Sequence, residues 1–92
     1  MLFILILYAC MFEAQIKVTL KKTVADPQGQ TIKHALESFG FASIDQVRMG
    51  KFITVTLKAK DFAAAKDEAA KMCAKLLANP IIEDYSIEVK PL

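Results

Sequence analysis

Few residues of this chain could do chemistry: one histidine, two cysteines and a pair of adjacent carboxylates. His34 has no serine or cysteine nearby in sequence with a third group to orient it, so no local nucleophile and base pair is indicated. Cys73 falls on the apolar stripe of an alanine-rich segment, where a thiol behaves as a small apolar group. We therefore expect both to be structural and predict no catalytic residue. The alternative, a small hydrolase that uses Cys73 or His34, requires catalytic activity of the purified single chain.

The cysteines do not indicate a metal site either. Cys10 and Cys73 lie in unlike contexts, and neither belongs to a CxxC motif or to a Cys/His set with zinc spacing. Two reduced thiols in a cytoplasmic protein are the simplest interpretation. Glu83 and Asp84 are adjacent at the start of a predicted strand, so their side chains point to opposite faces. We expect solvated charges there, with no acid–base or metal-binding pair.

Three polar motifs remain as candidate contact sites for a partner. Each also has a plain structural interpretation as a helix cap, a turn or a loop. The candidate contact residues are Asp26, Pro27, Gln28 and Gly29 in the first motif, Arg48, Gly50 and Lys51 in the second, and Asn79, Pro80, Glu83, Asp84 and Tyr85 in the third.

Length and charge limit the classes of protein. A chain of 92 residues with net charge +2 fits one domain. Such a domain buries only about two thirds of its unfolded surface, so association with another subunit is plausible. Basic and acidic residues are interspersed, whereas nucleic-acid binders cluster their cations. The strand containing Phe52 has one aromatic residue and no RNA-binding motif, so we expect no nucleic-acid partner.

The first ten residues, MLFILILYAC, are apolar without interruption. They are shorter than the roughly 20 residues that a membrane-spanning helix needs, and no Lys or Arg precedes them as in a secretory signal. We expect no membrane association. We interpret residues 1–10 as an extension from a misassigned start or an added segment, and residues 11–92 as one domain.

Hydrophobic periodicity predicts the elements that position these residues. Strict alternation from Phe12 predicts a half-buried strand. Asp26 and Pro27 suit a helix start, and Gly40 suits its end. Alternation also predicts a β-hairpin over residues 43–57 with its turn near Gly50, its first strand being irregular.

A second helix is predicted from Asp61, where an apolar stripe and many alanines begin, to Asn79 before Pro80. Tyr85, Ile87 and Val89 then alternate as a last strand. The order is β-α-β-β-α-β, which predicts an α+β fold, ferredoxin-like in order, with an antiparallel sheet and both helices on one face. The other face is polar apart from Phe52 and Ile82, so another subunit such as a second copy could partly cover it.

Five fragments occur in order along the chain: VTLK at 18–21, DPQG at 26–29, HAL at 34–36, VRMGK at 47–51 and CAKLLANPIIEDY at 73–85. Together they resemble the PurS family of phosphoribosylformylglycinamidine (FGAM) synthase subunits. The resemblance covers residues 12–89 and departs from the family only in residues 1–10, since such proteins begin near Met11.

The resemblance implies a non-catalytic subunit in purine biosynthesis, forming a homodimer or tetramer. Its implied partners are a PurL-type synthetase and a PurQ-type glutaminase, which it bridges so that ammonia passes between them. No cofactor is implied for this subunit, whereas ATP and magnesium are implied for the synthetase. The alternative is a small regulatory module with the same strand order that binds an amino acid or nucleotide.

Overall fold

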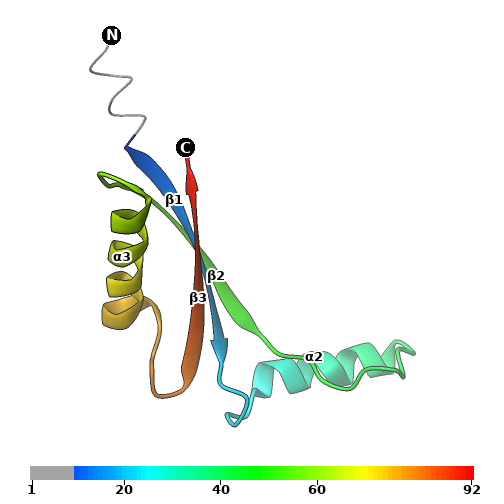
Figure 1. Cartoon of the computed structure of the whole chain (residues 1–92). Helices are drawn as coiled ribbons and strands as arrows, with labels where there is room; N and C mark the ends of the chain where they lie inside the picture. Colours follow the sequence, from blue (N-terminus) through cyan, green and yellow to red (C-terminus); the bar gives the residue numbers. More distant parts are fainter. Residues whose placement is uncertain (1–9) are drawn as a thin grey trace.

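The computed structural model describes residues 10–92, and it confirms the α+β class with an antiparallel sheet and two helices (Figure 1). The elements in chain order are β1 (Met11–Leu20), α2 (Pro27–Ser38), β2 (Gly50–Lys58), α3 (Phe62–Met72), the π-helical turn η1 (Cys73–Leu77) and β3 (Glu83–Pro91).

The sheet has three antiparallel strands in the order β2-β1-β3. Ile16 in the central strand lies opposite Ile53 on one side and Ile87 on the other. Residues directly opposite share a face, so the alternation in each strand builds one apolar face. Ile16 and Val18 on that face are fully buried, as the pattern from Phe12 predicts.

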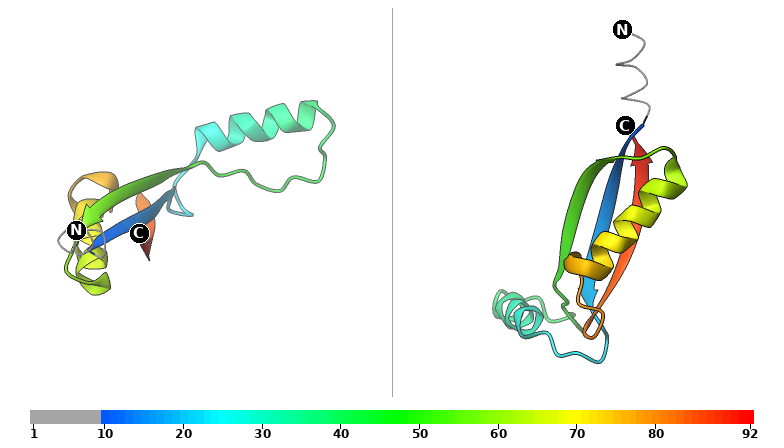
Figure 2. Two further views of the ribbon diagram at one scale, coloured as in Figure 1. Left: turned by 90° about the horizontal axis from the view of Figure 1, so that it is seen from above. Right: turned by 90° about the vertical axis from the view of Figure 1, so that its left-hand side faces the viewer.

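Helix α3 covers the apolar face, as Figure 2 shows in its right-hand view. Ala65 and Ala69 are fully buried, and their small side chains let the helix backbone approach the strands closely. Cys73 follows in η1 and packs in a second cluster with Ile16 and Val18. The core therefore lies between one helix and the sheet.

Local signals set both helix starts and the end of α2 where the sequence predicts them, whereas the second helix, predicted to run to Asn79, ends at Met72 and is followed by η1 up to Leu77. Asp61 Oδ1 accepts the Ala64 N–H at 2.8 Å and caps α3. Asp26 caps α2 in the same way through Gly29, with Pro27 in the first turn. Past the end of α2, Gly40 has a φ of 97°, a left-handed conformation that glycine adopts at low cost.

The expectation of two helices on one face is wrong for α2. In all three ribbon views α2 projects away from the end of the sheet (Figures 1 and 2). Its stripe of Ile32, Leu36 and Phe39 therefore faces no strand, and Phe39 is 79% exposed. Apolar spacing indicated a surface to be covered, but it did not indicate what would cover it.

The expected first strand of the hairpin, within residues 43–49, is also not formed. Residues 44–49 are extended and run back from the tip of α2 without joining the sheet. The physical reason is that β1 ends at Leu20, one residue past the Thr19 and Gly50 pair, so no strand lies opposite residues 44–48. The Met49 N–H bonds to a side chain instead, and β2 starts without a hairpin.

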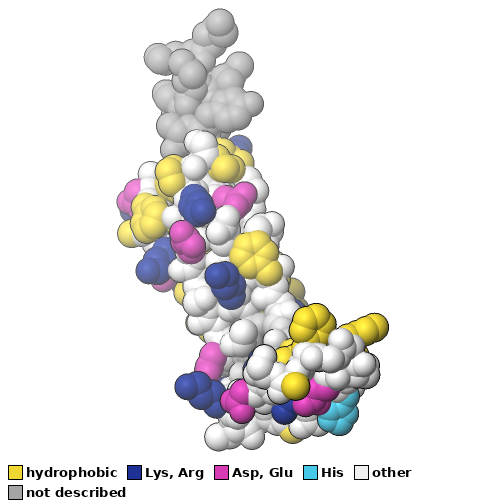
Figure 3. Space-filling model, turned by 90° about the vertical axis from the view of Figure 1, so that its right-hand side faces the viewer, with side chains coloured by type: hydrophobic (Ala, Val, Ile, Leu, Met, Phe, Trp, Pro, Cys, Tyr) yellow, Lys and Arg dark blue, Asp and Glu magenta, His cyan; other side chains and the backbone are white. Residues whose placement is uncertain are grey.

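We call α2 and residues 39–46 the arm. Figure 3 shows the face of the sheet opposite α3, where basic and acidic side chains are interspersed. Hydrophobic side chains gather on the arm, in the lower part of the picture. Phe52 on this sheet face is exposed, as are Phe39 and Phe41 on the arm. Within residues 10–92 no helix is both long and apolar enough to cross a membrane.

Candidate functional site

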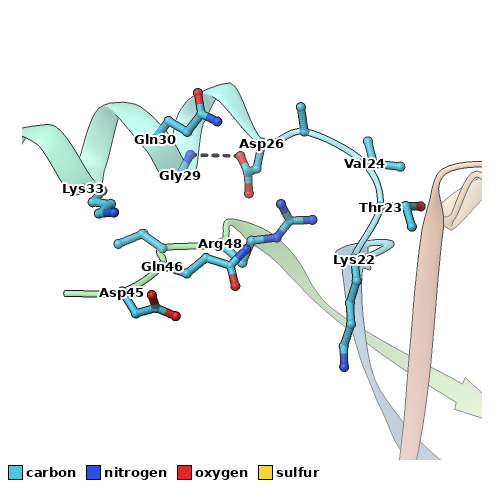
Figure 4. Close-up of a pocket in the computed structure, with 12 residues that line it drawn as sticks. Lys22, Thr23, Val24, Asp26, Gly29, Gln30, Lys33, Asp45, Gln46 and Arg48 are labelled. Atoms are coloured by element: carbon cyan, nitrogen blue, oxygen red, sulfur yellow. Dashed lines mark hydrogen bonds between the residues drawn. The ribbon is translucent and has the colours of Figure 1, made fainter.

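Most of the predicted contact residues meet where the arm joins the sheet. We call this region the neck: residues 21–26, which leave β1, and residues 47–49, which enter β2. A pocket of about 350 Å³ opens there, and Lys22, Lys33 and Arg48 line it together with Asp26 and Asp45 (Figure 4). The chain has therefore brought the first two predicted motifs to one place.

Asp26 is the buried charged residue of the described chain, with 3% of its surface exposed. Oδ1 accepts the Gly29 N–H at 2.9 Å, and Oδ2 accepts the Met49 N–H at 2.7 Å. These backbone donors, first Met49 and then Gly29, hold the pKa of the Asp26 carboxyl below its usual 3.8, with a further contribution from Arg48. Asp26 thus serves as more than the helix cap that its position predicts.

Gly29 is needed for the close approach of the two sides of the neck. A β-carbon at Gly29 would collide with the backbone carbonyl of Val47. The glycine therefore lets the first turn of α2 lie directly against the segment that enters β2. Its place in the DPQG motif is explained by this contact.

Lys21 is a residue of this site that sequence reasoning missed. Its carbonyl accepts a hydrogen bond from Arg48 Nη2 at 2.9 Å, and its Nζ lies 2.8 Å from Asp84 Oδ1. Its N–H also donates to the Ile82 carbonyl at 2.9 Å. Lys21 therefore links the neck to the third motif. Only its place at the end of an alternating strand could have signalled this.

The third motif reaches the same end of the sheet through Glu83. Glu83 Oε2 lies 3.6 Å from Lys51 Nζ, while Oε1 accepts the Asn79 N–H at 2.7 Å. A second pocket of about 180 Å³ is lined by Asp26, Lys51 and Glu83 among others. Gln28 and Gly50 also line it. All three predicted motifs therefore contribute to one continuous region.

The remaining candidates lie around this region. Pro27 lines a shallow hollow together with Ile32 of α2 and Met49 of the neck. Asn79 and Pro80 are exposed on the loop between η1 and β3, where Asn79 Oδ1 accepts the Ile81 N–H at 3.1 Å. Tyr85 lies opposite Val18 and is partly exposed.

Large apolar side chains stand in solvent beside these polar groups. Leu76 in η1 is 83% exposed and Ile81 in the following loop is 81% exposed. The hydrogen bonds of Asn79 and Glu83 fix this loop, so the two side chains are presented on an ordered backbone. Exposed apolar groups beside charged ones are typical of a surface that contacts another protein.

The residues considered for catalysis are not brought together. His34 is exposed on α2, in the projecting arm, whereas Cys73 is fully buried against the sheet. Burial raises the pKa of the Cys73 thiol, which favours the unreactive protonated form. Cys10 and Cys73 are both free thiols. Residues 10–92 contain no group of three or more metal-binding side chains.

Comparison with known proteins gives one consistent family. The family model described as PurS, phosphoribosylformylglycinamidine (FGAM) synthase, matches residues 13–91. A phosphoribosylformylglycinamidine synthase subunit PurS from Bacillus subtilis is 42% identical over 81 residues, covering 87% of this chain and 94% of the relative. The corresponding subunit from Methanocaldococcus jannaschii is 39% identical over 82 residues, covering 89% and 99%.

Solved structures agree with the sequence relatives. The crystal structure of Methanocaldococcus jannaschii PurS, a subunit of formylglycinamide ribonucleotide amidotransferase, superposes with a TM-score of 0.79 at 38% identity, covering 88% of this chain and 98% of that one. A chain in the structure of PurLQS from Thermotoga maritima superposes with a TM-score of 0.77 at 33% identity, covering 89% and 98%.

Proposed function

This chain belongs to the PurS family of phosphoribosylformylglycinamidine synthase subunits, and we propose that within this enzyme it acts as an adaptor. It is a subunit of the synthase in purine biosynthesis. In our proposal it joins a PurQ-type glutaminase, which releases ammonia, to a PurL-type synthetase, which uses ATP and magnesium. The chain itself holds no cofactor and works in the cytoplasm.

The observation that carries this proposal is the likeness to a chain of the PurLQS structure over nearly its whole length. That assembly contains subunits of three kinds by its name. A chain that has the same fold and 33% sequence identity is expected to contact its partner subunits through the same surfaces. An adaptor role also has a physical reason, because ammonia that escapes into water diffuses away or becomes protonated.

The geometry at one end of the sheet supports the same role. The neck, Lys51 and Glu83 lie there, and the loop that carries the exposed Ile81 is tied to the same end by the Lys21 N–H bond to the Ile82 carbonyl, so charged and apolar groups occur together. Surfaces of this composition suit protein contacts, since apolar groups supply affinity and charges supply specificity. The uncovered stripe of the arm supports self-association of the chain into dimers or tetramers as well.

Charge reversal tests whether this end of the sheet contacts a partner subunit. Lys51 suits the test because its side chain is 61% exposed, whereas Arg48 is tied to the Lys21 carbonyl and its loss would disturb the neck. We expect Lys51→Glu to weaken assembly with the two partner subunits roughly tenfold, as a lost charged contact does. Lys58→Glu, at the other end of β2, is the matched control.

Light scattering of the three mixed subunits measures this assembly, and thermal unfolding of each variant alone checks its folding. Weaker assembly for Lys51→Glu alone supports the contact. If both variants assemble as well as the wild-type chain does, Lys51 does not lie in the interface. Failure of the wild-type chain to assemble would overturn the adaptor role.

One observation favours a second candidate function, binding of a small ligand. The neck pocket of about 350 Å³ has the size of small-molecule sites and carries both cations and carboxylates. An amino acid or nucleotide bound there would raise the melting temperature of the chain without partner subunits. Thermal unfolding with glutamine, glycine, ATP or AMP decides this, and an unchanged melting temperature with all four excludes them as ligands.

A further inference from the structure

The second hydrogen bond of Asp26 joins two segments that are 23 residues apart. One carboxylate oxygen caps α2 through Gly29, while the other holds Met49 at the entrance of β2. A cap alone would need only the first bond. The two sides of the neck are thus held by one buried side chain.

Apolar packing does little to hold the arm in place. Among the described residues, no buried hydrophobic side chain lies between Thr19 and Thr56, and Gly29 is the one buried residue of α2. Asp26 lines two pockets, of about 350 and 180 Å³. Without a packed core at the neck, directional hydrogen bonds are the forces that can set its angle.

We propose that Asp26 is a positioning residue that fixes the angle between the arm and the sheet. Its carboxylate ties the first turn of α2 to Met49, so the two polypeptide segments that connect the arm to the sheet are locked together. The arm then presents Phe39 and Phe41 in one fixed direction. Because the claim concerns the chain by itself, it does not rest on the adaptor role.

Replacing Asp26 by asparagine separates the two functions of the side chain. Asparagine caps helices as well as aspartate does, so its carbonyl oxygen keeps the bond to Gly29. Its amide NH₂ then faces the Met49 N–H, and two donors cannot bond to each other. Asp61→Asn is the matched control, because Asp61 caps α3 through Ala64 and makes no second bond to a distant segment.

Amide hydrogen exchange reads out the bond directly in the full chain. We expect the Met49 amide of Asp26→Asn to exchange roughly tenfold faster than in the wild-type chain, as loss of a charged hydrogen bond implies. Asp61→Asn should leave Met49 unchanged. Protection of Met49 within about twofold of wild type in Asp26→Asn would overturn the proposal.

The angle itself is measured with spin labels on Glu37→Cys in α2 and Lys66→Cys in α3, both exposed, in a Cys10→Ser background. Labelled chains are diluted with unlabelled ones so that distances within one chain dominate. We expect a narrow distance distribution that Asp26→Asn broadens and Asp61→Asn does not. An equally narrow distribution in Asp26→Asn would mean that Asp26 is only a helix cap.

A measurement on the wild-type chain keeps the proposal falsifiable if Asp26→Asn does not fold. In an NMR titration toward low pH, the amide protons of Met49 and Gly29 should shift together with one pKa, because both bond to the same carboxylate. The midpoint should lie below 3.8. A Met49 amide that does not follow the titration of Gly29 contradicts the two-sided bond.

Discussion

Gly29 lies so close to the carbonyl oxygen of Val47 that a β-carbon at residue 29 would overlap it. The first turn of α2 and the segment that enters β2 therefore meet backbone to backbone. Such contact leaves no flexible side chain to move aside, so any larger residue must push the neck apart.

Gly29→Ala should destabilise the chain by about 2 kcal/mol, the typical cost of forcing extra atoms into a packed site. Gly40→Ala is the matched control at the tip of the arm. It has open space around it but a φ of 97°, so it should cost about 1 kcal/mol through backbone strain alone. Urea unfolding measures both. A smaller loss for Gly29→Ala than for Gly40→Ala would contradict the close contact.

The fit of α3 on the sheet depends on small side chains. Ala69 is fully buried against the first core cluster, so Ala69→Leu should cost about 1–3 kcal/mol by overpacking. Ala63→Leu, on the exposed side of the same helix, should change the unfolding free energy by less than about 0.5 kcal/mol. Thermal or urea unfolding of both variants checks this, and equal stabilities would refute the packing described for α3.

Cys73 should react with thiol reagents only when the chain unfolds. The side chain is fully buried, and burial raises its pKa, so the thiolate is scarce and out of reach. The absorbance change after addition of an aromatic disulfide should report a slow reaction of Cys73. Denaturant should accelerate this reaction, and Cys73→Ala should abolish it. A fast reaction of Cys73 in native buffer would show that η1 does not seal the second core cluster.

Stability should depend on pH through Asp26. Its pKa is lowered in the folded chain from an ordinary value of 3.8, so the folded state favours the carboxylate. The stabilisation is full above about pH 5 and is lost as the pH falls through the lowered folded pKa. The other charged residues that line the pocket with Asp26 are Lys22, Lys33, Asp45 and Arg48.

The matched comparison for this pH effect is Asp26→Asn, which cannot titrate there. The difference in unfolding free energy between the wild-type chain and Asp26→Asn should be constant above about pH 5 and shrink below pH 3.8. Urea unfolding at several pH values measures it. A difference that grows on acidification would have the wrong sign for a carboxylate held by N–H donors.

Much of the sheet and both helix starts could be predicted because their causes are local. The alternation from Phe12 defines one buried face, and Asp26 and Asp61 cap the helices that follow them. These signals depend on residues a few positions apart. The same holds for the left-handed Gly40, which ends the helical turn as glycine does at many helix ends.

The arm could not be predicted because its causes are long-range. The stripe on α2 has the same period whether it covers a sheet or projects from one, and Ile44 to Met49 alternate too weakly to distinguish a strand from an extended connection. The bond from Asp26 to Met49 spans 23 residues, and the role of Lys21 depends on its contacts with Arg48 and Asp84, which lie far from it in the sequence. The spacing of residues in the sequence predicts none of these long-range contacts.

The most direct test of the adaptor role is glutamine-dependent formation of formylglycinamidine ribonucleotide by the cognate synthetase and glutaminase, with and without this chain. We predict that activity with glutamine requires the chain, while activity with added ammonium chloride is much less dependent on it, because free ammonia bypasses the transfer between subunits. Equal glutamine-dependent activity with and without the chain, under conditions where the subunits assemble, would contradict the account.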